Sequence, residues 1–546
     1  MTQETENRHV RYLKQMVAQG KIGRREFLRS ATLLGLSATA AYGFVGQLSG
    51  GGAVSPALAA MPKGGTVRIS MRVMKIDSPH IFDWAEKSNI VRQVCQYLTR
   101  TGYDNVTRPY LLEKWEVSDD LRTWTLHLRK EIKWHNGRAF TADDVVWNFK
   151  HVLDPATGSS MIGLFKGYLM NDQATALWDA NAIEKVDDHT VRLNCKTPQL
   201  AVPEHLFHYP FLILDPEEGG QFKAGSNGTG PFELVQHDIG RKSVFKARSD
   251  YWGDGAYLDT LEFVDLGGDP AADLTALTSR QVDGLFGAGP DTLRGLKAID
   301  HAQMYQVVTA ETAVVRGKLS EKPFQDARVR KALRLAVDPE KILKVSLGPL
   351  GLPGEHHHVC PIHPEYAKLP PMQRDVAKAR SLLAEAGYPD GVDLEIACAS
   401  DVPWQINGVQ AMVQQWQEAG IRVKIKSMPS ASYWDVWDKV PFGYTLWYHR
   451  PLGIMVLGLA YRSGAPWNES GYANPEFDKL LNQAEGTLDV DKRREVMAKI
   501  CEIMQEDGPI VQPVWRSVFT FYDKRVMGFR MHPSNCIFGE ELAIQA

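Results

Sequence analysis

The chain has 546 residues, of which 44% are hydrophobic and 23% charged, and its formal net charge is −3 at pH 7. This length exceeds what one hydrophobic core supports, so we expect two or more lobes. The ordinary composition excludes a fibrous or disordered protein, and the weakly acidic balance gives no electrostatic case for nucleic-acid binding. None of the six cysteines forms a C-x-x-C pair, which argues against zinc-ribbon and thioredoxin sites but allows one or two disulfides.

The N-terminal residues 1–59 are expected to be an export signal. They contain a motif that resembles the twin-arginine signal, followed by a small-residue apolar stretch that is too short for a stable membrane span. A basic helix ahead of a membrane anchor is the alternative interpretation. The motif residues are Arg24, Arg25, Phe27 and Leu28, and the expected A-x-A cleavage site uses Ala57 and Ala59.

The first elements of the body are a strand and a helix. Residues 63–70 predict a strand after a glycine-containing start, and residues 90–98 predict a helix because Val91, Val94, Cys95 and Leu98 share one face.

Residues 111–153 carry the clearest local pattern. Apolar and polar residues alternate over 124–128, which predicts a half-buried strand. Asn136-Gly137 is a turn signal, and Thr141 stands three residues before Asp144, as in a capping box at a helix start. This stretch therefore predicts a strand, a turn and a capped helix.

Residues 190–193 alternate as a further strand, and residues 227–232 form a glycine-rich segment. We interpret the glycines as a tight crossover, because they allow backbone conformations that other residues resist. A phosphate loop is the alternative, but neither the P-loop nor the dinucleotide fingerprint is present, and G-x-S-x-G also fails because Ala224 replaces the first glycine.

The second half of the chain predicts helices that alternate with a strand. Residues 322–338 place apolar residues at helical spacing, while in 375–388 Asp375 can cap the helix start and Gly387 suits its end. Residues 406–426 read as helix, glycine and strand, which is an α/β unit.

These motifs, in this order, resemble the extracytoplasmic solute-binding proteins of family 5, the dipeptide, oligopeptide and nickel receptors of ABC importers. The resemblance covers about residues 63–530. Its motifs lie at residues 115–120, 126–130, 134–137, 141–145, 227–232, 245–253, 322–338, 375–388 and 472–481. We interpret the motif residues themselves as builders of the fold and not as the ligand site.

The resemblance implies an α/β fold of two lobes, a type II periplasmic binding protein of the cluster C kind, with a ligand cleft between the lobes. Lobe I would combine residues 61–104, 227–312 and 512–546, and lobe II would span 313–511. An extra domain over 105–226 would lie beside lobe I. Such proteins close on their ligand by hinge motion.

The resemblance also implies a function. We expect a monomeric periplasmic receptor that captures a peptide-like or other small polar solute and delivers it to the permease subunits of an ABC importer, after export by the twin-arginine translocase. A metal or metal-chelate uptake receptor is one alternative, and a sensor or chaperone without transport is another. No enzyme motif is present, and no cofactor or nucleic-acid partner is expected.

Peptide-binding family members use an acidic loop residue for the ligand's amino terminus, and that residue is missing from residues 445–453. An arginine stands nearby, so we expect a solute with an anionic or strongly polar group, since guanidinium groups favour carboxylate and phosphate. A structural ion pair is the alternative role for this arginine. The candidate ligand residues are Trp404, Trp447, Tyr448, His449, Arg450 and His358.

Residues 355–363 contain a cluster of histidines and one cysteine that resembles a metal site. Histidine and cysteine are good ligands for nickel, copper or zinc, but neighbouring histidines in a loop cannot all face one ion. Hydrogen bonding in the cleft and plain loop structure are the alternatives. The candidate ligands are His356, His357 and His363.

Overall fold

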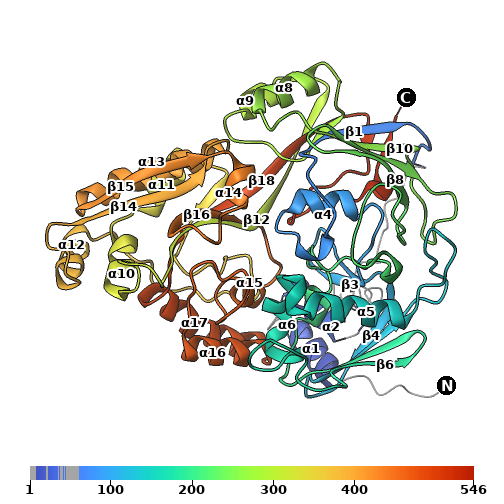
Figure 1. The fold of residues 1–546 in the computed structure, drawn as a ribbon, viewed down its shortest axis with the longest axis horizontal. Helices are drawn as coiled ribbons and strands as arrows, with labels where there is room; N and C mark the ends of the chain where they lie inside the picture. Colours follow the sequence, from blue (N-terminus) through green and yellow to red (C-terminus); the bar gives the residue numbers. More distant parts are fainter. Residues whose placement is uncertain are drawn as a thin grey trace.

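The computed structural model describes residues 8–19, 23–34, 36, 41, 44 and 61–545. The body forms two α/β lobes that share one twisted sheet, and a smaller domain lies beside the first lobe (Figure 1). This architecture confirms the predicted fold class.

Lobe I is a sheet with short helices packed around it. Its elements are β1 (Thr66–Ser70), α4 (Ala85–Val91), β8 (Phe232–Asp238), β9 (Lys242–Ala247), β10 (Thr260–Val264), α8 (Pro270–Thr278), β11 (Gly284–Leu285) and α9 (Leu293–Lys297). Strand β1 runs parallel to both β10 and β11, and the β9–β8 hairpin extends the sheet beyond β10. The side chains of Val67, Ile69, Leu261 and Phe263 are fully buried, so alternate residues of β1 and β10 build the core of this lobe.

Lobe II is also built from helices that alternate with strands. Its elements are α10 (Ala327–Leu335), α11 (Pro339–Ser346), β13 (Gly351–Pro353), α12 (Val376–Glu385), β14 (Val392–Ala399), α13 (Pro403–Glu418), β15 (Ile421–Met428), α14 (Ser430–Trp434) and β16 (Phe442–Trp447). Strand β14 runs parallel to β15 and β16. Asp375 caps α12, and Gly387 adopts the positive φ of +94° that the sequence predicts at the helix end.

Two long strands connect the lobes. They are β12 (Ala302–Gly317) and β18 (Val514–Asp523), with the short β17 (Ile510–Val511) beside them. The first part of β12 pairs with β18 in lobe I, and its second part pairs with β16 in lobe II. The pairing shifts register between Val308 and Glu311, so a bulge lies where β12 passes from one lobe to the other.

The smaller domain contains an antiparallel sheet and two main helices. Its elements are β2 (Thr99–Thr101), β3 (Thr107–Pro109), β4 (Leu112–Val117), β5 (Thr123–Leu128), α5 (Ala142–Leu153), α6 (Met161–Leu169), β6 (Ile183–Asp187), β7 (Thr190–Asn194) and α7 (Val202–His205). The sheet order is β4-β5-β7-β6, and β5 alternates between half-buried and buried residues as predicted.

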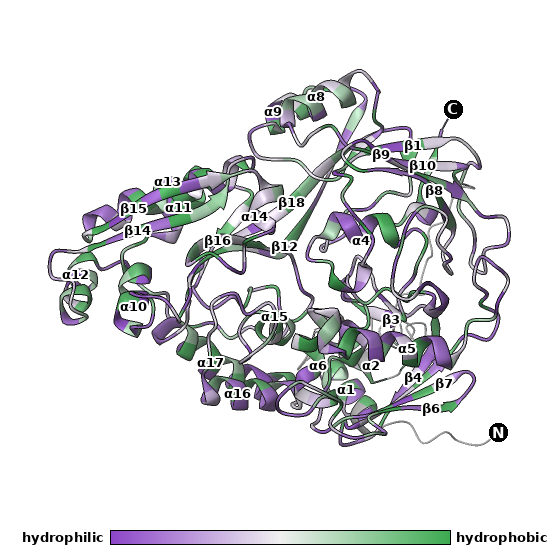
Figure 2. Ribbon diagram, in the orientation of Figure 1, coloured by the Kyte–Doolittle hydropathy of each residue, from purple (hydrophilic) through white to green (hydrophobic). Residues whose placement is uncertain are grey.

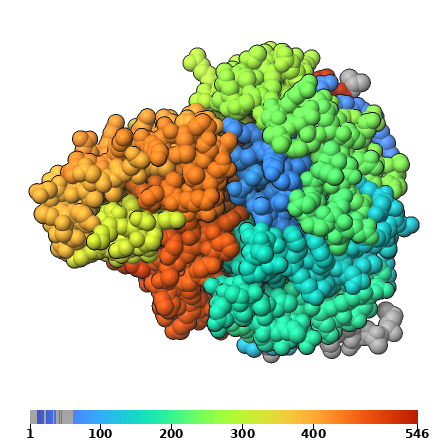
Figure 3. Space-filling model, in the orientation of Figure 1, coloured from blue at the N-terminus to red at the C-terminus, as the bar shows by residue number. Residues whose placement is uncertain are grey.

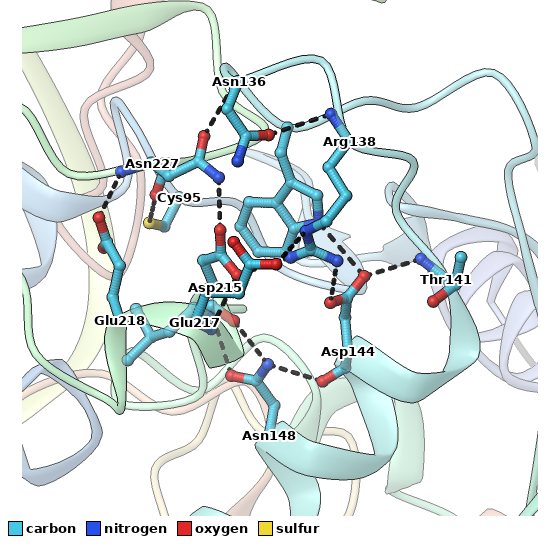
Figure 4. Close-up of polar contacts among 12 residues, drawn as sticks. Cys95, Asn136, Arg138, Thr141, Asp144, Asn148, Asp215, Glu217, Glu218 and Asn227 are labelled. Carbon is cyan, nitrogen blue, oxygen red and sulfur yellow. Dashed lines mark hydrogen bonds and ion pairs between the residues drawn. The ribbon is translucent and has the colours of Figure 1, made fainter.

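Signature residues of this domain share one polar network with Asp215 and with Asn227 of the glycine-rich segment (Figure 4). Arg138 donates to Asp144 at 2.7 Å and to Asp215 at 2.6 Å, and the amide of Asn227 donates to Asp215. The backbone N–H of Thr141 donates to Asp144, which completes the predicted capping box. These contacts support the interpretation that the signature builds the fold.

The chain after β16 packs against the smaller domain. Helices α15 (Gly453–Ala460), α16 (Pro475–Glu485) and α17 (Val490–Glu506) share a hydrophobic cluster with α5 and α6. Figure 2 shows polar residues on outer helices such as α12 and α16, and apolar residues where β12 meets β16. The last short strands, β19 (Val526–Met527) and β20 (Ala543–Ile544), pair with each other. The predicted domain boundaries remain our proposal.

Two N-terminal helices, α1 (Arg8–Ala18) and α2 (Arg24–Leu33), pack against this part of the body. Phe27 and Ala31 are fully buried, and Arg29 donates to the backbone carbonyl of Asn105. The predicted cleavage residues Ala57 and Ala59 lie outside the described residues. No helix in the described part of the chain is long and apolar enough to span a membrane.

Two sequence predictions need correction or completion. The helix predicted at residues 90–98 runs earlier and ends at Val91, because the carbonyls of Gln93 and Val94 accept hydrogen bonds from Phe232 and Gly230. All six cysteines lie within residues 61–545, and each is buried with a free thiol, so the disulfides that composition allowed are not formed here.

Candidate functional site

A cleft of about 240 Å³ lies between lobe I and lobe II. Its walls are the segments that follow β1, β10 and β11 in lobe I, and β14 and β16 in lobe II. In open α/β sheets, ligands bind outside the carboxyl ends of parallel strands, and here two such edges face each other. Figure 3 shows the corresponding seam, where orange lobe II meets the blue first part of lobe I.

Polar contacts cross this cleft and hold the lobes together. Arg72, two residues after β1, forms an ion pair with Asp401, two residues after β14, at 2.6 Å. The indole N–H of Trp84 donates to the hydroxyl of Tyr448 at 2.9 Å, and that hydroxyl contacts Glu86 at 3.4 Å. The structure is therefore a closed arrangement of the two lobes.

Carboxylates outnumber guanidinium groups in the cleft. Both arginines already have acidic partners, since Arg72 pairs with Asp401 and Arg516 pairs with Glu311 at 2.5 Å. The ionisable lining residues are Arg72, Glu86, Asp265, Asp273, Asp291, Asp401 and Arg516. The remaining acids give the cleft a negative balance.

Two of these acids have raised pKa values. Burial raises the pKa of Glu86 to about 7, and its backbone, Arg72 and Tyr448 only partly offset the effect. Burial also raises the pKa of Asp273, although the hydroxyl of Ser70 donates to it. Burial alone would raise the pKa of Asp401, but hydrogen bonds from Ser430 and Arg72 lower it. A bound cation would favour the charged forms of Glu86 and Asp273.

The sequence profile of the bacterial extracellular solute-binding proteins, family 5, matches residues 107–461. The chain belongs to this family.

Relatives and solved structures extend the match over most of the chain. The periplasmic oligopeptide-binding protein OppA of Haemophilus influenzae is 26% identical over 81% of this chain and 86% of its own length. A dipeptide-binding protein of Pseudomonas aeruginosa is 27% identical over 81% and 91%. The periplasmic binding protein DppA from Helicobacter pylori, solved in complex with the peptide STSA, superposes with a TM-score of 0.78 at 20% identity, covering 89% of this chain and 99% of that chain. The fold is thus the two-lobed type II arrangement expected for family 5.

Two of the predicted ligand residues line the cleft. Trp404 lies in the first turn of α13, and the guanidinium of Arg516 stacks 5.4 Å from its ring. Tyr448 lies just after β16 and faces Trp84 of lobe I. The two side chains belong to different segments of lobe II, yet the parallel β14 and β16 bring those segments to the same edge.

Three other predicted residues lie behind this wall and have internal partners. Trp447 donates its indole N–H to Glu469 at 3.0 Å. His449 accepts from the backbone N–H of Ala310 through Nδ1, and His358 hydrogen-bonds with Tyr461 at 2.6 Å. All three are buried, and none belongs to the cleft lining.

Arg450 also lies outside the cleft lining. Only 4% of the residue is exposed, and Nη1 donates to the carbonyls of Tyr448 and His449. Its guanidinium stacks 5.1 Å from the ring of Tyr209, and burial lowers its pKa. No carboxylate in the described residues forms an ion pair with it.

The histidine loop makes backbone contacts. His356 accepts from Gln512 N–H and His357 accepts from Val359 N–H, while burial lowers the pKa of each to about 3. His363 accepts from Cys360 N–H and donates to the carbonyl of Arg450. Within the described ranges, no group of three His, Cys, Asp or Glu side chains is arranged to hold a metal ion.

The sequence reasoning missed Arg72, Glu86 and Asp401. Arg72 and Asp401 are 329 positions apart, so no local pattern pairs them. A signal did exist for Arg72, because it is a charged residue two positions beyond the strand predicted at residues 63–70. Asp401 has the same position after β14, a strand that the sequence did not predict.

Proposed function

We propose that this protein is the periplasmic receptor of an ABC importer and captures a short peptide or peptide-like solute between its lobes. The observation that carries the proposal is the closed cleft between two facing carboxyl edges, bridged by Arg72–Asp401 and Trp84–Tyr448. Family membership supports it, as do relatives named oligopeptide- and dipeptide-binding proteins.

The volume of the cleft supports a short solute. At about 15 Å³ for each water-sized group, its 240 Å³ accommodates on the order of 16 such groups, which matches a dipeptide or small tripeptide. Trp404 and Tyr448 would supply flat apolar walls. Glu86 and Asp273 would take a cationic amine, which replaces the role of the missing acidic loop residue.

The other predicted residues would act from behind the wall. Trp447, His449 and His358 would hold the segment after β16 in place through their buried hydrogen bonds. His356, His357 and His363 would have a similar structural role, because a ring nitrogen of each accepts a backbone N–H group.

Capture would be followed by transfer. The closed form would dock on the permease subunits, because ligand binding and lobe closure change the surface that the two lobes present together. The receptor would act as a monomer. The protein would reach the periplasm by the twin-arginine route, supported by the motif Arg24, Arg25, Phe27 and Leu28.

Native mass spectrometry of the exported protein tests this function. We expect a bound species whose mass fits a short peptide and which disappears on mild denaturation. Small-angle scattering should then show a smaller radius of gyration with that solute than without it. A bound metal ion, or a confirmed peptide that leaves the scattering curve unchanged, would contradict the proposal.

A further inference from the structure

A second, smaller cavity lies behind the cleft. It has a volume of about 30 Å³, and its walls come from lobe I, the smaller domain and the segment after β16. We call it the arginine cavity, because Arg92 of lobe I and Arg450 of lobe II both line it. Since its walls belong to both lobes, the cavity is complete only when the lobes are closed.

The two arginines are buried and lack carboxylate partners. Arg92 is 8% exposed and Arg450 is 4% exposed, and neither forms an ion pair in the described structure. Arg92 donates to the carbonyl and hydroxyl of Ser88 and to Tyr97, but its Nη1 has no hydrogen-bond partner, and neither has Nε of Arg450. The Cys536 thiol faces both guanidinium groups, and its negative form would offset part of their charge. Buried charge that is compensated only in part is costly, so this arrangement favours an added anion.

The remaining polar groups of the cavity are compatible with an anion. The Oε2 atom of Glu204 and Nε2 of His208 also lack partners. Burial raises the pKa of Glu204 to about 7, so its neutral form can donate a hydrogen bond. Burial would raise the pKa of the Cys536 thiol, but Arg92 and His532 outweigh burial and bring it to about 7. The lowered pKa of this thiol thus reflects the positive charge of the groups around it.

We propose that the arginine cavity binds a carboxylate-sized anion between Arg92 and Arg450, and that this anion favours lobe closure. Closure brings a buried guanidinium from each lobe to one cavity, which is unfavourable unless negative charge compensates them. At 10–15 Å³ for each water-sized group, 30 Å³ holds about two or three such groups, which fits a carboxylate and excludes a larger anion.

Two sources could supply the carboxylate. The cavity shares Tyr209 and Arg450 with a narrow aromatic pocket, and that pocket shares Trp434, Leu446 and Tyr448 with the cleft. This connecting pocket has a volume of only about 10 Å³, so the carboxyl end of a solute in the cleft would reach the arginines only if the aromatic side chains of this pocket move apart, an arrangement that rests on the proposed function. A free small carboxylate from solution is the other source.

Sodium formate is the probe for the site itself. We expect formate to raise the Tm of the purified wild-type protein saturably, and more than a bulky sulfonate does at equal ionic strength. Arg92→Met and Arg450→Met should lose this rise, Arg92→Lys should retain part of it, and the exposed control Arg241→Met should keep it in full. An equal formate response in wild type and both methionine variants, or no saturable response in wild type, would overturn the proposal.

A peptide pair identifies the source of the carboxylate. If the solute supplies it, a dipeptide with a free carboxyl group should bind about 10- to 100-fold more tightly than its amide, and Arg450→Met should abolish the difference. Equal binding of acid and amide, together with the formate response, supports the site with a free anion as occupant. If no peptide binds, the proposed function fails, and the formate experiment still decides the fate of the arginine cavity.

Discussion

The cross-lobe ion pair between Arg72 and Asp401 should stabilise the closed state directly. Replacing Arg72 by Met removes the charge but keeps an apolar stem of similar length, and Asp401 retains its hydrogen bonds from the N–H and hydroxyl of Ser430. The two side chains are 25% and 29% exposed, so solvent screens the 2.6 Å contact only in part. We expect the pair to contribute about 1–2 kcal/mol, which corresponds to a 5- to 30-fold change in the ratio of closed to open molecules.

Calorimetry with the solute identified by mass spectrometry can measure this contribution. Arg72→Met should bind about 5- to 30-fold more weakly than wild type, and adding Asp401→Asn to it should cost little more, because the pair is already broken. Arg422→Met is a matched control, since Arg422 forms a 2.7 Å ion pair with Asp393 inside lobe II. Wild-type affinity in Arg72→Met would refute the reasoning. If the losses of the two single substitutions add fully in the double variant, Arg72 acts on the solute and not through its ion pair with Asp401.

Three further predictions concern export, charge and packing. Replacing Arg24 and Arg25 together by Lys should leave precursor in the cytoplasm; normal periplasmic accumulation on immunoblots of cell fractions would exclude the twin-arginine route. Because Glu86 has a higher pKa folded than unfolded, its ionisation should reduce stability as pH rises from about 4.5 to about 7. Glu86→Gln should therefore gain stability relative to wild type across that range, on the order of 3 kcal/mol in urea unfolding at pH 7.5 and little at pH 4.5; parallel pH curves would contradict this. Gly228→Ala would place a Cβ 2.1 Å from the carbonyl oxygen of Val94, so we expect a loss of about 1–3 kcal/mol in the same assay; an unchanged unfolding midpoint would show that the backbone yields freely there.

Local patterns in the sequence predicted local structure well. The alternation in β5, the capping box of α5 and the glycine at the end of α12 each depend on residues within a few positions, and the structure confirms all three. The helix predicted at residues 90–98 failed for the opposite reason. Its later part follows the apolar spacing of a helix, but its backbone bonds to the glycine-rich segment at 228–232, more than a hundred residues away.

The residues of the candidate site also differ in whether the sequence could predict them. Trp404 could be selected from sequence because it precedes a predicted helix, and Tyr448 because it lies in residues 445–453, the stretch that corresponds to the family's acidic loop. The charged partners could not be selected, because Arg72 meets Asp401 only after the two lobes of the shared sheet face each other. For Arg450, the residue type suggested an anion, whereas its burial, its lack of an ionic partner and its proximity to the same cavity as Arg92 depend on the fold.

The path of the chain through the shared sheet determines when each part of the sheet can be completed during synthesis. Strand β18 lies between β11 and β12, but it follows the whole of lobe II in sequence. While the ribosome is still making lobe II, the sheet of lobe I therefore has an unfilled gap and an exposed edge at β12. Lobe II and the smaller domain can form their own pairings earlier, since their strands are complete by then. A nascent chain released before β18 would carry a finished lobe II on an unfinished lobe I, so completion of the fold waits for the end of translation.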